Sequence, residues 1–357
     1  MAAVIYDLGG TFLRGALSDD SGSILAGSLQ KKRLDFMQAN RPPEFVWQEI
    51  ISAMLSFEAG VRHQVPPEAP VILSFPGPIQ RPSHILRAPT VVGGTTALPD
   101  LAAILRRFMG RPVHIINDIS AATWYLSRIL PAQRFLVVTI SSGIGSKIFD
   151  RDHPRGVLDD IPYAGEIGHA TVDRSPNAML CDCGGRGHLG AISSGRGMER
   201  WARRRARENP EQFATSACVV KFAATPDNLD NEHHLVPAAK RRDPWALQVI
   251  QECCYPLAQM LLSVVMAIGI EKVVVIGGFA LALGEVYLKI LQKSLEDICD
   301  FDIMVDYLDN LIMMGDAHEE ACLEGAAVFA ARLGLSLSSH NAEVLNFPDS
   351  DEPIRRW

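Results

Sequence analysis

The chain has no excess of basic residues, and this absence sets the first limit on its function. Its 357 residues include 34 lysines and arginines against 41 aspartates and glutamates, which gives a net charge of −7. Such a balance does not favour a general nucleic-acid binder, whose affinity comes from neutralising phosphates. Hydrophobic residues make up 48% and charged residues 21% of the chain, which excludes a disordered protein and is typical of a globular enzyme.

Segments that would direct the chain into or across a membrane are also missing from the sequence. Met1 leads directly into an apolar stretch that ends at Asp7, without the basic n-region of a secretory signal. The longest apolar stretch, residues 257–270, carries Gln259 and Ser263 and is shorter than a bilayer requires. Seven cysteines, an odd number, favour free thiols or a metal site over a disulfide framework. We therefore expect a soluble cytoplasmic protein without membrane contacts.

Apolar segments of strand length alternate with helical segments, which predicts α/β layers, and the chain length favours two domains. No repeat of solenoid period is present. Residues 203–242 are charged and aperiodic and are expected to form a surface excursion. The expected strands are residues 3–8, 14–18, 23–29, 71–75, 113–116, 134–140, 144–149, 272–276 and 301–305. The expected helices are residues 43–58, 101–109, 119–129, 245–268, 281–291 and 319–333.

A glycine-rich turn after the first expected strand is the first candidate nucleotide site. Asp7 closes the strand, and Gly9, Gly10 and Thr11 follow it. A carboxylate here can reach a phosphate-bound Mg²⁺ through water, because that ion keeps much of its hydration shell. The glycines and the threonine offer N–H and hydroxyl donors to phosphate oxygens. A hairpin turn with an acidic edge is the alternative, and no Gly-Lys-Ser/Thr sequence indicates a Walker-type loop.

The second half of the chain contains a counterpart of this turn. Ser141, Ser142 and Gly143 separate the expected strands 134–140 and 144–149. One such turn can hold one end of a polyphosphate, and two facing turns can clamp it. The repeated pattern therefore predicts that the chain binds a nucleotide such as ATP.

Asn117 and Asp118 stand between a short apolar strand and a helix, and two interpretations of the aspartate remain open. It can cap the helix N-terminus, which is the commoner use of an aspartate in this position. It can also act as the general base that accepts the proton of a substrate hydroxyl attacking phosphorus. The local sequence does not separate these alternatives.

A cluster of cysteines and histidines in the middle of the chain predicts a metal site. Cys181 and Cys183 precede a glycine-rich stretch and His188, and His169 lies twelve residues before Cys181. These four ligands suit structural Zn²⁺, with a loop of incidental thiols as the alternative. Four protein ligands leave no open position for a metal-bound water, which disfavours a zinc hydrolase. The metal would instead make rigid the loop that carries Glu166.

These patterns, in this order, resemble the ROK sugar kinases of the actin-like ATPase superfamily, from residue 4 to about residue 333. The resemblance implies two actin-like (ribonuclease H-like) α/β domains with the active site in the cleft between them. We expect one domain over residues 1–118, with a helix at 316–333 packing back on it. The second domain is expected over 119–335 with a zinc knuckle at 165–190, followed by a surface tail at 336–357. The resemblance rests on residues 7–11, 76–79, 116–118, 164–169, 181–188, 194–195 and 274–278.

The resemblance also implies roles for single residues in an ATP- and Mg²⁺-dependent kinase, and it favours a homodimer. Asp118 corresponds to the catalytic base that acts on a primary hydroxyl. The implied zinc ligands are His169, Cys181, Cys183 and His188. The implied substrate-binding positions are Pro76, Gly77, Thr90, Asn117, Glu166 and His169. The implied nucleotide-binding positions are Asp7, Gly9, Gly10, Thr11, Ser141, Ser142, Gly143, Gly277 and Gly278.

Three departures from the family pattern bear on the substrate. His188 stands where the family usually has a third cysteine, and the resulting two-cysteine, two-histidine set remains a competent zinc site. Gly190 replaces a glutamate, and Thr90 an asparagine, that hexose-phosphorylating members use to bind the sugar. Each lost contact is worth about 1–3 kcal/mol when buried. We therefore expect a C7-cyclitol, phosphorylated on its exocyclic CH₂OH, to be preferred over plain glucose.

Other functions within the family remain as alternatives. Glucokinase and amino-sugar 6-kinase activities keep the chemistry and change only the acceptor. A sugar-sensing protein without catalysis belongs to a different class, but Asp118 and the first phosphate turn favour an enzyme. A repressor needs a helix-turn-helix before the phosphate turn, and the six residues that precede Asp7 leave no room for one.

Overall fold

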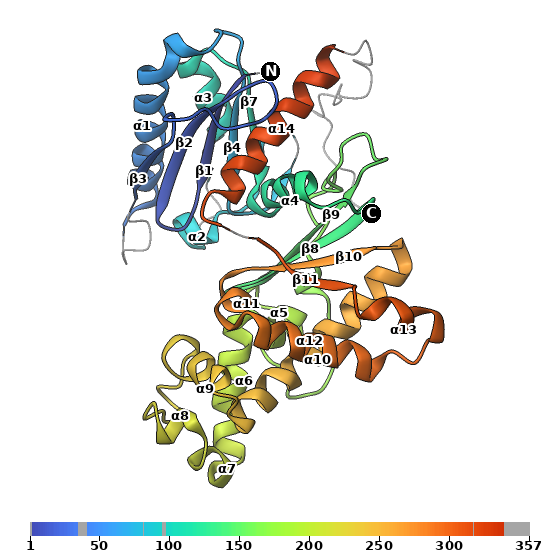
Figure 1. Ribbon diagram of the computed structural model, residues 1–357. Coiled ribbons are helices and arrows are strands. Elements are labelled where there is room, and N and C mark those ends of the chain that lie inside the picture. Colours follow the sequence, from blue (N-terminus) through green and yellow to red (C-terminus); the bar gives the residue numbers. More distant parts are fainter. Residues whose placement is uncertain (1, 35–40, 81, 95–97, 317, 339–357) are drawn as a thin grey trace. The chain divides into compact units, whose positions relative to one another are not determined.

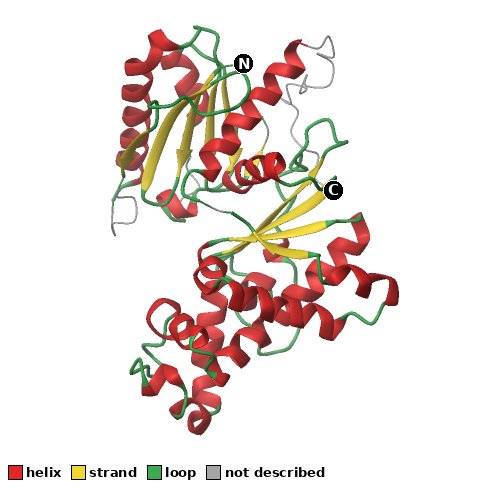
Figure 2. Ribbon diagram, in the orientation of Figure 1, coloured by secondary structure: helices red, strands yellow, loops and turns green. Residues whose placement is uncertain are grey.

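The computed structural model describes residues 2–34, 41–80, 82–94, 98–316 and 318–338, and the chain divides into two compact units. Unit 1 comprises Met1–Pro131, Asp152–Ala164 and His318–Trp357, and unit 2 comprises Ala132–Arg151 and Gly165–Ala317. Each unit contains a β-sheet with helices (Figures 1 and 2). The division differs from the expected boundary at residue 118, because helix α4 (Asp118–Ile129) packs within unit 1. Most of the expected tail, residues 339–357, lies outside the described residues.

Unit 1 contains a five-stranded sheet in the order β3-β2-β1-β4-β7. Strands β1, β4 and β7 are parallel, with β7 at one edge, and β2 and β3 extend the sheet on the other side of β1 as antiparallel neighbours. This combination is the expected opening meander followed by crossover connections through helices. The strands are β1 (Ala3–Leu8), β2 (Phe12–Ser18), β3 (Gln30–Arg33), β4 (Val71–Phe75) and β7 (Val113–Asn117).

The side chains of β1 alternate between two hydrophobic cores, as the twofold period of a strand requires. Val4 and Tyr6 pack with residues of α1 (Pro43–Val61) and α3 (Leu101–Met109). Ala3 and Ile5 pack on the other face, with residues of α4 and α14. Asp7 continues this second series, so its carboxylate lies on the α4 and α14 side of the sheet.

Helix α14 (Ala321–Ser338) packs closely on α4 and β1, as the expected helix at 316–333 should. Gly325 makes this contact possible, since a Cβ there would lie 1.7 Å from the carbonyl oxygen of Ala121. Alanine is about 1 kcal/mol better than glycine in a helix, but this overlap forces the helices apart. We expect Gly325→Ala to lower the free energy of unfolding by about 2 kcal/mol or more in urea denaturation.

Gly60, near the end of α1, provides the matched control. A Cβ at Gly60 would meet nothing within 4 Å, and the residue is exposed. Gly60→Ala should therefore stabilise the protein by about 0.5–1 kcal/mol. Equal effects of the two substitutions would contradict the close packing of α14 on α4.

Unit 2 contains a four-stranded sheet in the order β11-β10-β8-β9. Strands β8 and β9 form the expected hairpin, and β10 pairs in parallel with both β8 and β11. The strands are β8 (Arg134–Ile140), β9 (Ile144–Asp150), β10 (Lys272–Ile276) and β11 (Ile312–Met314). The larger helices of this unit are α6 (Gly195–Glu208), α10 (Pro244–Ile268) and α12 (Glu285–Ile298).

Helix α10 is long and apolar enough to cross a membrane by length and composition alone, with half of its most apolar window buried inside the structure. It is longer than the apolar stretch recognised in the sequence, because it extends back to Pro244. Its buried residues, including Cys253, Cys254 and Leu257, belong to the hydrophobic core of unit 2. The apolar character of α10 is therefore that of a core helix.

Four sequence-based predictions of local structure are wrong. Residues 203–242 are largely helical with buried side chains such as Leu235 and Ala238, so they belong to the core of unit 2. Residues 301–305 lie mostly in a helix, and the last strand is β11. Residues 23–29 form turns before β3, and Gly284 divides the expected helix at 281–291.

The remaining elements are short. They are η1 (Arg62–Gln64), β5 (Ile79–Gln80), β6 (His84–Ile85), α2 (Pro89–Val92), η2 (Ile167–His169), α5 (Leu189–Ser193), α7 (Pro210–Ala214), α8 (Ala217–Val220), the π-helix η3 (Asn231–Leu235), α9 (Val236–Lys240), α11 (Gly278–Leu283) and α13 (Asp302–Leu308).

Candidate active site

The carboxyl ends of β1, β4 and β7 bring the predicted catalytic residues of unit 1 together. Asp7 pairs in register with Ser74 of β4, and Ser74 pairs with Ile116 of β7. Asn117 and Asp118 follow directly after Ile116. Ligand sites of open α/β sheets form at the carboxyl ends of the strands, because the chain leaves each strand there and continues as a loop or helix.

Asp7 is almost completely buried and forms an ion pair with Arg14 of β2, with 3.1 Å between Oδ2 and Nη1. Burial raises the pKa of the Asp7 carboxyl above its ordinary value, and the neighbouring Ser74 and Arg14 only partly oppose this rise. Arg14 also donates to Glu319 at 2.6 Å, just before α14. Burial makes the ionised form of the Asp7 carboxyl costly, and a cation bound beside it would offset this cost.

Asn117, rather than Asp118, caps helix α4. Its Oδ1 accepts hydrogen bonds from the amides of Ile119 (2.9 Å) and Ser120 (3.3 Å). Its Nδ2 donates to Oδ1 of Asp118 at 2.9 Å, and that oxygen also accepts from the amide of Ile119 at 2.9 Å. Asp118 is the first residue of the helix and half-buried. The capping interpretation therefore applies to its neighbour, while two donors fix the orientation of the Asp118 carboxylate.

Three of the predicted substrate-binding positions lie together beside Asn117. The carbonyl oxygen of Gly77 accepts from Asn117 Nδ2 at 2.9 Å, and that of Pro76 accepts from the Thr90 hydroxyl at 3.4 Å. Gly77 is required for close approach, because a Cβ there would lie 2.4 Å from the carbonyl oxygen of Arg87. Pro76, Gly77 and Thr90 thus form one local wall with the residue next to Asp118.

Cys322 of α14 is a member of this site that the sequence did not reveal. Its Sγ donates to the carbonyl oxygen of Asp118 at 3.5 Å. Burial raises the pKa of the Cys322 thiol far above its usual range, and the charges of Asp7 and Asp118 raise it further. Both aspartates therefore lie near the same side chain, although they are 111 residues apart in the chain.

The first glycine-rich turn has the geometry of a hairpin connection with an exposed tip. The amide of Gly9 donates to the carbonyl oxygen of Phe12 at 2.9 Å, which closes the turn. Gly10 and Thr11 are exposed. A Cβ on Gly9 would lie 3.1 Å from Nη1 of Arg14. The backbone donors presented to solvent are therefore those of Gly10 and Thr11, while Gly9 shapes the turn.

The second turn lies next to Gly277 and Gly278, where strands β8 and β10 of unit 2 end. The amide of Ser141 donates to the carbonyl oxygen of Gly143 at 3.0 Å, and Ser142 and Gly143 are exposed. Gly277 has φ +101°, and a Cβ there would lie 2.6 Å from the backbone of Ile140. A Cβ on Gly278 would lie 3.8 Å from the Ser141 hydroxyl. The residues predicted to bind nucleotide in unit 2 are thus neighbours.

Two glycines hold the loop that carries Glu166 and His169 against strand β9. The carbonyl oxygen of Gly165 accepts from the amide of Ser146 at 2.8 Å. A Cβ on Gly165 would lie 1.8 Å from the carbonyl oxygen of Ser146, and one on Gly168 would lie 2.3 Å from that of Ile144. Larger residues would push the loop off the strand, and the spacing of the glycines therefore fixes where the two polar side chains emerge.

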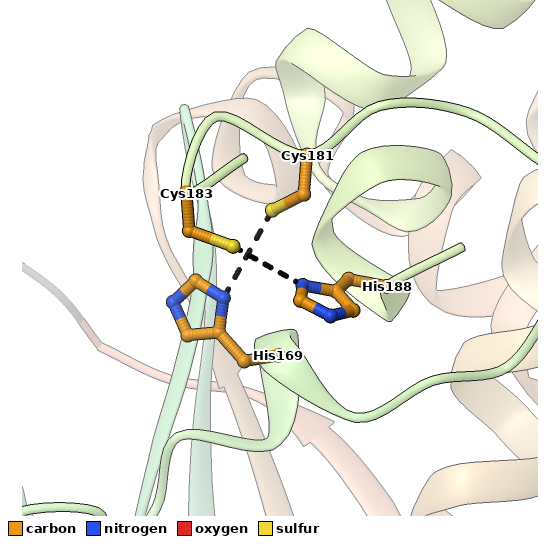
Figure 3. Close-up of side chains that lie close together, drawn as sticks. All are labelled: His169, Cys181, Cys183 and His188. Carbon is orange, nitrogen blue, oxygen red and sulfur yellow. Dashed lines mark hydrogen bonds between the residues drawn. The ribbon is translucent and has the colours of Figure 1, made fainter. Parts of the chain in front are cut away.

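The four predicted zinc ligands converge on one point (Figure 3). Their ligand atoms all lie within 4.8 Å of one another. Cys181 Sγ is 3.9 Å from Nδ1 of His169, and Cys183 Sγ is 3.3 Å from Nδ1 of His188. Zn–S bonds of about 2.3 Å and Zn–N bonds of about 2.0 Å place tetrahedral ligands roughly 3.5 Å apart. The donor set and its spacing therefore fit a zinc ion.

Next to this cluster lies a pocket of about 110 Å³ within unit 2. It joins residues of the second turn, the Glu166 loop and the cysteine knuckle, and it includes the predicted family departure Gly190. Arg200 of α6 also contributes to it. The lining residues are Ser142, Gly143, Ile144, Gly168, His169, Cys181, Asp182, Gly190 and Arg200.

The predicted residues therefore form two local groups. In unit 1, Asp7 and Asp118 gather around the sheet edge, with the wall of Pro76, Gly77 and Thr90. In unit 2, Ser142 and Gly143 line one pocket with His169 and Cys181, and Glu166 lies 3.9 Å from His169. Gly277 and Gly278 lie beside Ile140 and Ser141.

The chain has a two-domain α/β fold of the actin-like ATPase type, and solved structures share this fold. The ROK family glucokinase from Streptomyces griseus, in complex with glucose and AMPPNP, superposes with a TM-score of 0.64 at 24% identity, covering 92% of this chain and 98% of that one. The chain belongs to the ROK family, whose sequence model matches residues 3–332.

Two relatives add to this assignment. The C(7)-cyclitol 7-kinase of Streptomyces hygroscopicus subsp. limoneus is 35% identical over 341 residues, covering 93% of this chain and 94% of the relative. The glucokinase of Thermotoga maritima is 27% identical over 335 residues, covering 92% and 97%. The predicted family, fold class and enzyme class, a carbohydrate or cyclitol kinase, are thereby confirmed.

Proposed function

We propose that this protein transfers the γ-phosphoryl group of ATP to the exocyclic CH₂OH of a C7-cyclitol. The observation that carries the proposal is the placement of Asp118 at the edge where β1, β4 and β7 end, beside Asn117 and near Asp7. Similarity over nearly the whole length of a C(7)-cyclitol 7-kinase supports the acceptor.

Asp118 would accept the proton of the attacking hydroxyl as the bond to phosphorus forms. Asn117 holds the carboxylate through its Nδ2, so that the accepting oxygens keep one orientation. Asp7 would bind the Mg²⁺ of ATP through water, with Gly10 and Thr11 donating to phosphate oxygens. In unit 2, Ser142 and Gly143, with Gly277 and Gly278, would contact a nucleotide through their backbone donors.

His169, Cys181, Cys183 and His188 would hold a structural zinc ion, which supplies rigidity to the loop rather than an activated water. Their ligand atoms lie within 4.8 Å of one another and would complete a tetrahedral set. Glu166, three residues before His169, would then bind ring hydroxyls from a fixed position. His169 would border the acceptor as well as bind the metal.

The preference for a cyclitol rests on two departures from the family pattern. Gly190 lines the pocket of unit 2 without offering a polar group, and Thr90 bonds to the backbone of Pro76 at the wall in unit 1. The glutamate missing at Gly190 removes a contact to the anomeric end of a sugar, at about 1–3 kcal/mol. A cyclitol has no anomeric hydroxyl and does not lose this contact.

Mass-spectrometric screening of a mixture tests this function. The protein would be incubated with ATP, Mg²⁺, hexoses, amino sugars and hydroxymethyl cyclitols, and products that gain one phosphoryl group would be identified. We expect the cyclitols to be phosphorylated with a kcat/KM at least about 10-fold above that of glucose. A preference for glucose or for an amino sugar would show that the proposed acceptor is wrong. If no polyol in the mixture is phosphorylated, the result would favour a sugar sensor.

A further inference from the structure

Arg200 is a polar side chain in the unit 2 pocket to which the proposed function gives no role. Three of the lining residues are glycines, and His169 and Cys181 belong to the metal cluster. Ser142 and Gly143 form the phosphate turn. Of the remaining polar lining residues, Asp182 has both carboxylate oxygens engaged, which leaves the Arg200 guanidinium as the group that can meet a ligand.

The charges around Asp182 leave this wall of the pocket positive. Arg200 donates to Oδ1 of Asp182 at 2.8 Å, and Arg196 donates to Oδ2 at 3.1 Å. Two guanidinium groups thus share one carboxylate, and two positive charges less one negative charge leave one positive charge. The Nε of Arg200 also has no hydrogen-bond partner among the described residues. A neutral polyol does not require this excess charge, whereas an anion does.

Two other residues that line the pocket identify the anion. Ser142 and Gly143 line the same pocket as Arg200 and are the exposed residues of a turn whose backbone N–H groups suit phosphate oxygens. Guanidinium groups bind phosphate through paired N–H donors, and such groups stabilise the charge of a transferring phosphoryl group.

We propose that Arg200 and the Ser142–Gly143 turn together bind the γ-phosphate of ATP and keep hold of it during transfer. This inference rests on the proposed function in taking ATP as the phosphoryl donor, and it adds a binding residue from helix α6. The bond from the β,γ-bridging oxygen to phosphorus breaks and the bond from the acceptor oxygen forms, while Arg200 neutralises charge on the non-bridging oxygens and exchanges no proton.

Nucleotide binding tests this role without any acceptor. Titration calorimetry with AMPPNP and with ADP would compare the wild-type protein with Arg200→Gln and Arg200→Lys. We expect Arg200→Gln to weaken AMPPNP binding at least about 10-fold and to change ADP binding less than about twofold. Arg200→Lys should recover part of the lost affinity, because it keeps the charge without the planar pair of donors.

Arg196→Gln is the matched control, because Arg196 binds the same carboxylate but does not line the pocket. If Arg200 acts only by holding Asp182, both variants will behave alike, and the proposal is overturned. Equal losses for AMPPNP and ADP would also overturn it. An unchanged nucleotide affinity with a raised acceptor KM would assign Arg200 to the acceptor instead. The titration contains no acceptor, so its result does not depend on whether the cyclitol is phosphorylated. Failure of the proposed function and failure of the proposed role of Arg200 are therefore distinguishable.

Discussion

Replacing Asp118 with asparagine will lower the rate of phosphoryl transfer by about 10²- to 10⁴-fold, the range that a general base contributes. The variant should fold, because an asparagine Oδ1 can still accept the bonds from Asn117 Nδ2 and the Ile119 amide. Only the capacity to take the proton of the acceptor hydroxyl is lost. The measurement is kcat with saturating ATP and cyclitol.

AMPPNP affinity and Tm serve as controls for Asp118→Asn, and both should match the wild type. Asn117→Ala provides the contrasting case, in which stability is lost: it removes the cap of helix α4 and should lower the free energy of unfolding by about 1 kcal/mol. Turnover of Asp118→Asn close to that of the wild type would remove Asp118 from the mechanism.

Loss of the metal cluster should destabilise the fold and the acceptor loop together. We expect Cys183→Ser to lower bound zinc from about one ion per chain to near zero. Zinc at a thousandfold its Kd contributes about 4 kcal/mol of stability, so a clear fall in Tm should accompany its loss. Activity should fall as well, because His169 belongs both to the cluster and to the loop of Glu166.

Elemental analysis and thermal unfolding measure these effects, with Cys299→Ser as the control. Cys299 is a free thiol that lies outside the cluster, so its replacement should leave the zinc content unchanged. A zinc-free Cys183→Ser protein with the Tm of the wild type would refute the structural role. Loss of activity at unchanged stability would instead indicate a catalytic metal.

The sequence predicted those parts of the site whose chemistry lies in one short segment. Asp7 with its turn, Asn117 with Asp118, and the cysteine knuckle each combine a strand or loop end with adjacent functional residues. Their local structure follows from turn chemistry and ligand spacing. The structure brings the four cysteine and histidine ligand atoms within 4.8 Å of one another and assigns the cap of α4 to Asn117.

Contributions from distant elements could not be predicted in this way. Cys322 reaches Asp118 from α14, and Arg14 reaches Asp7 across a strand pair. Arg200 belongs to a stretch rich in arginine, where composition indicates only a solvated face. Their positions depend on packing, which a pattern within one segment does not record.

The errors in secondary structure have a similar cause. Residues 301–305 are apolar except for Asp302 and lie mostly in helix α13, whose Ile303 and Val305 are exposed. Residues 203–242 carry many charges, yet short helices there bury Leu235 and Ala238 in unit 2. Met304 of the first segment and Leu235 and Ala238 of the second pack on the core of unit 2, so tertiary packing overrides local preference in both segments.

The ³¹P NMR spectrum of the product formed from ATP and a hydroxymethyl cyclitol tests the central claim most directly. Transfer to the exocyclic CH₂OH predicts a phosphomonoester signal coupled to two methylene protons, formed by the wild-type protein and absent with Asp118→Asn. A phosphomonoester coupled to a single ring proton would contradict the proposed position of attack. Inorganic phosphate as the sole product would contradict the kinase reaction itself.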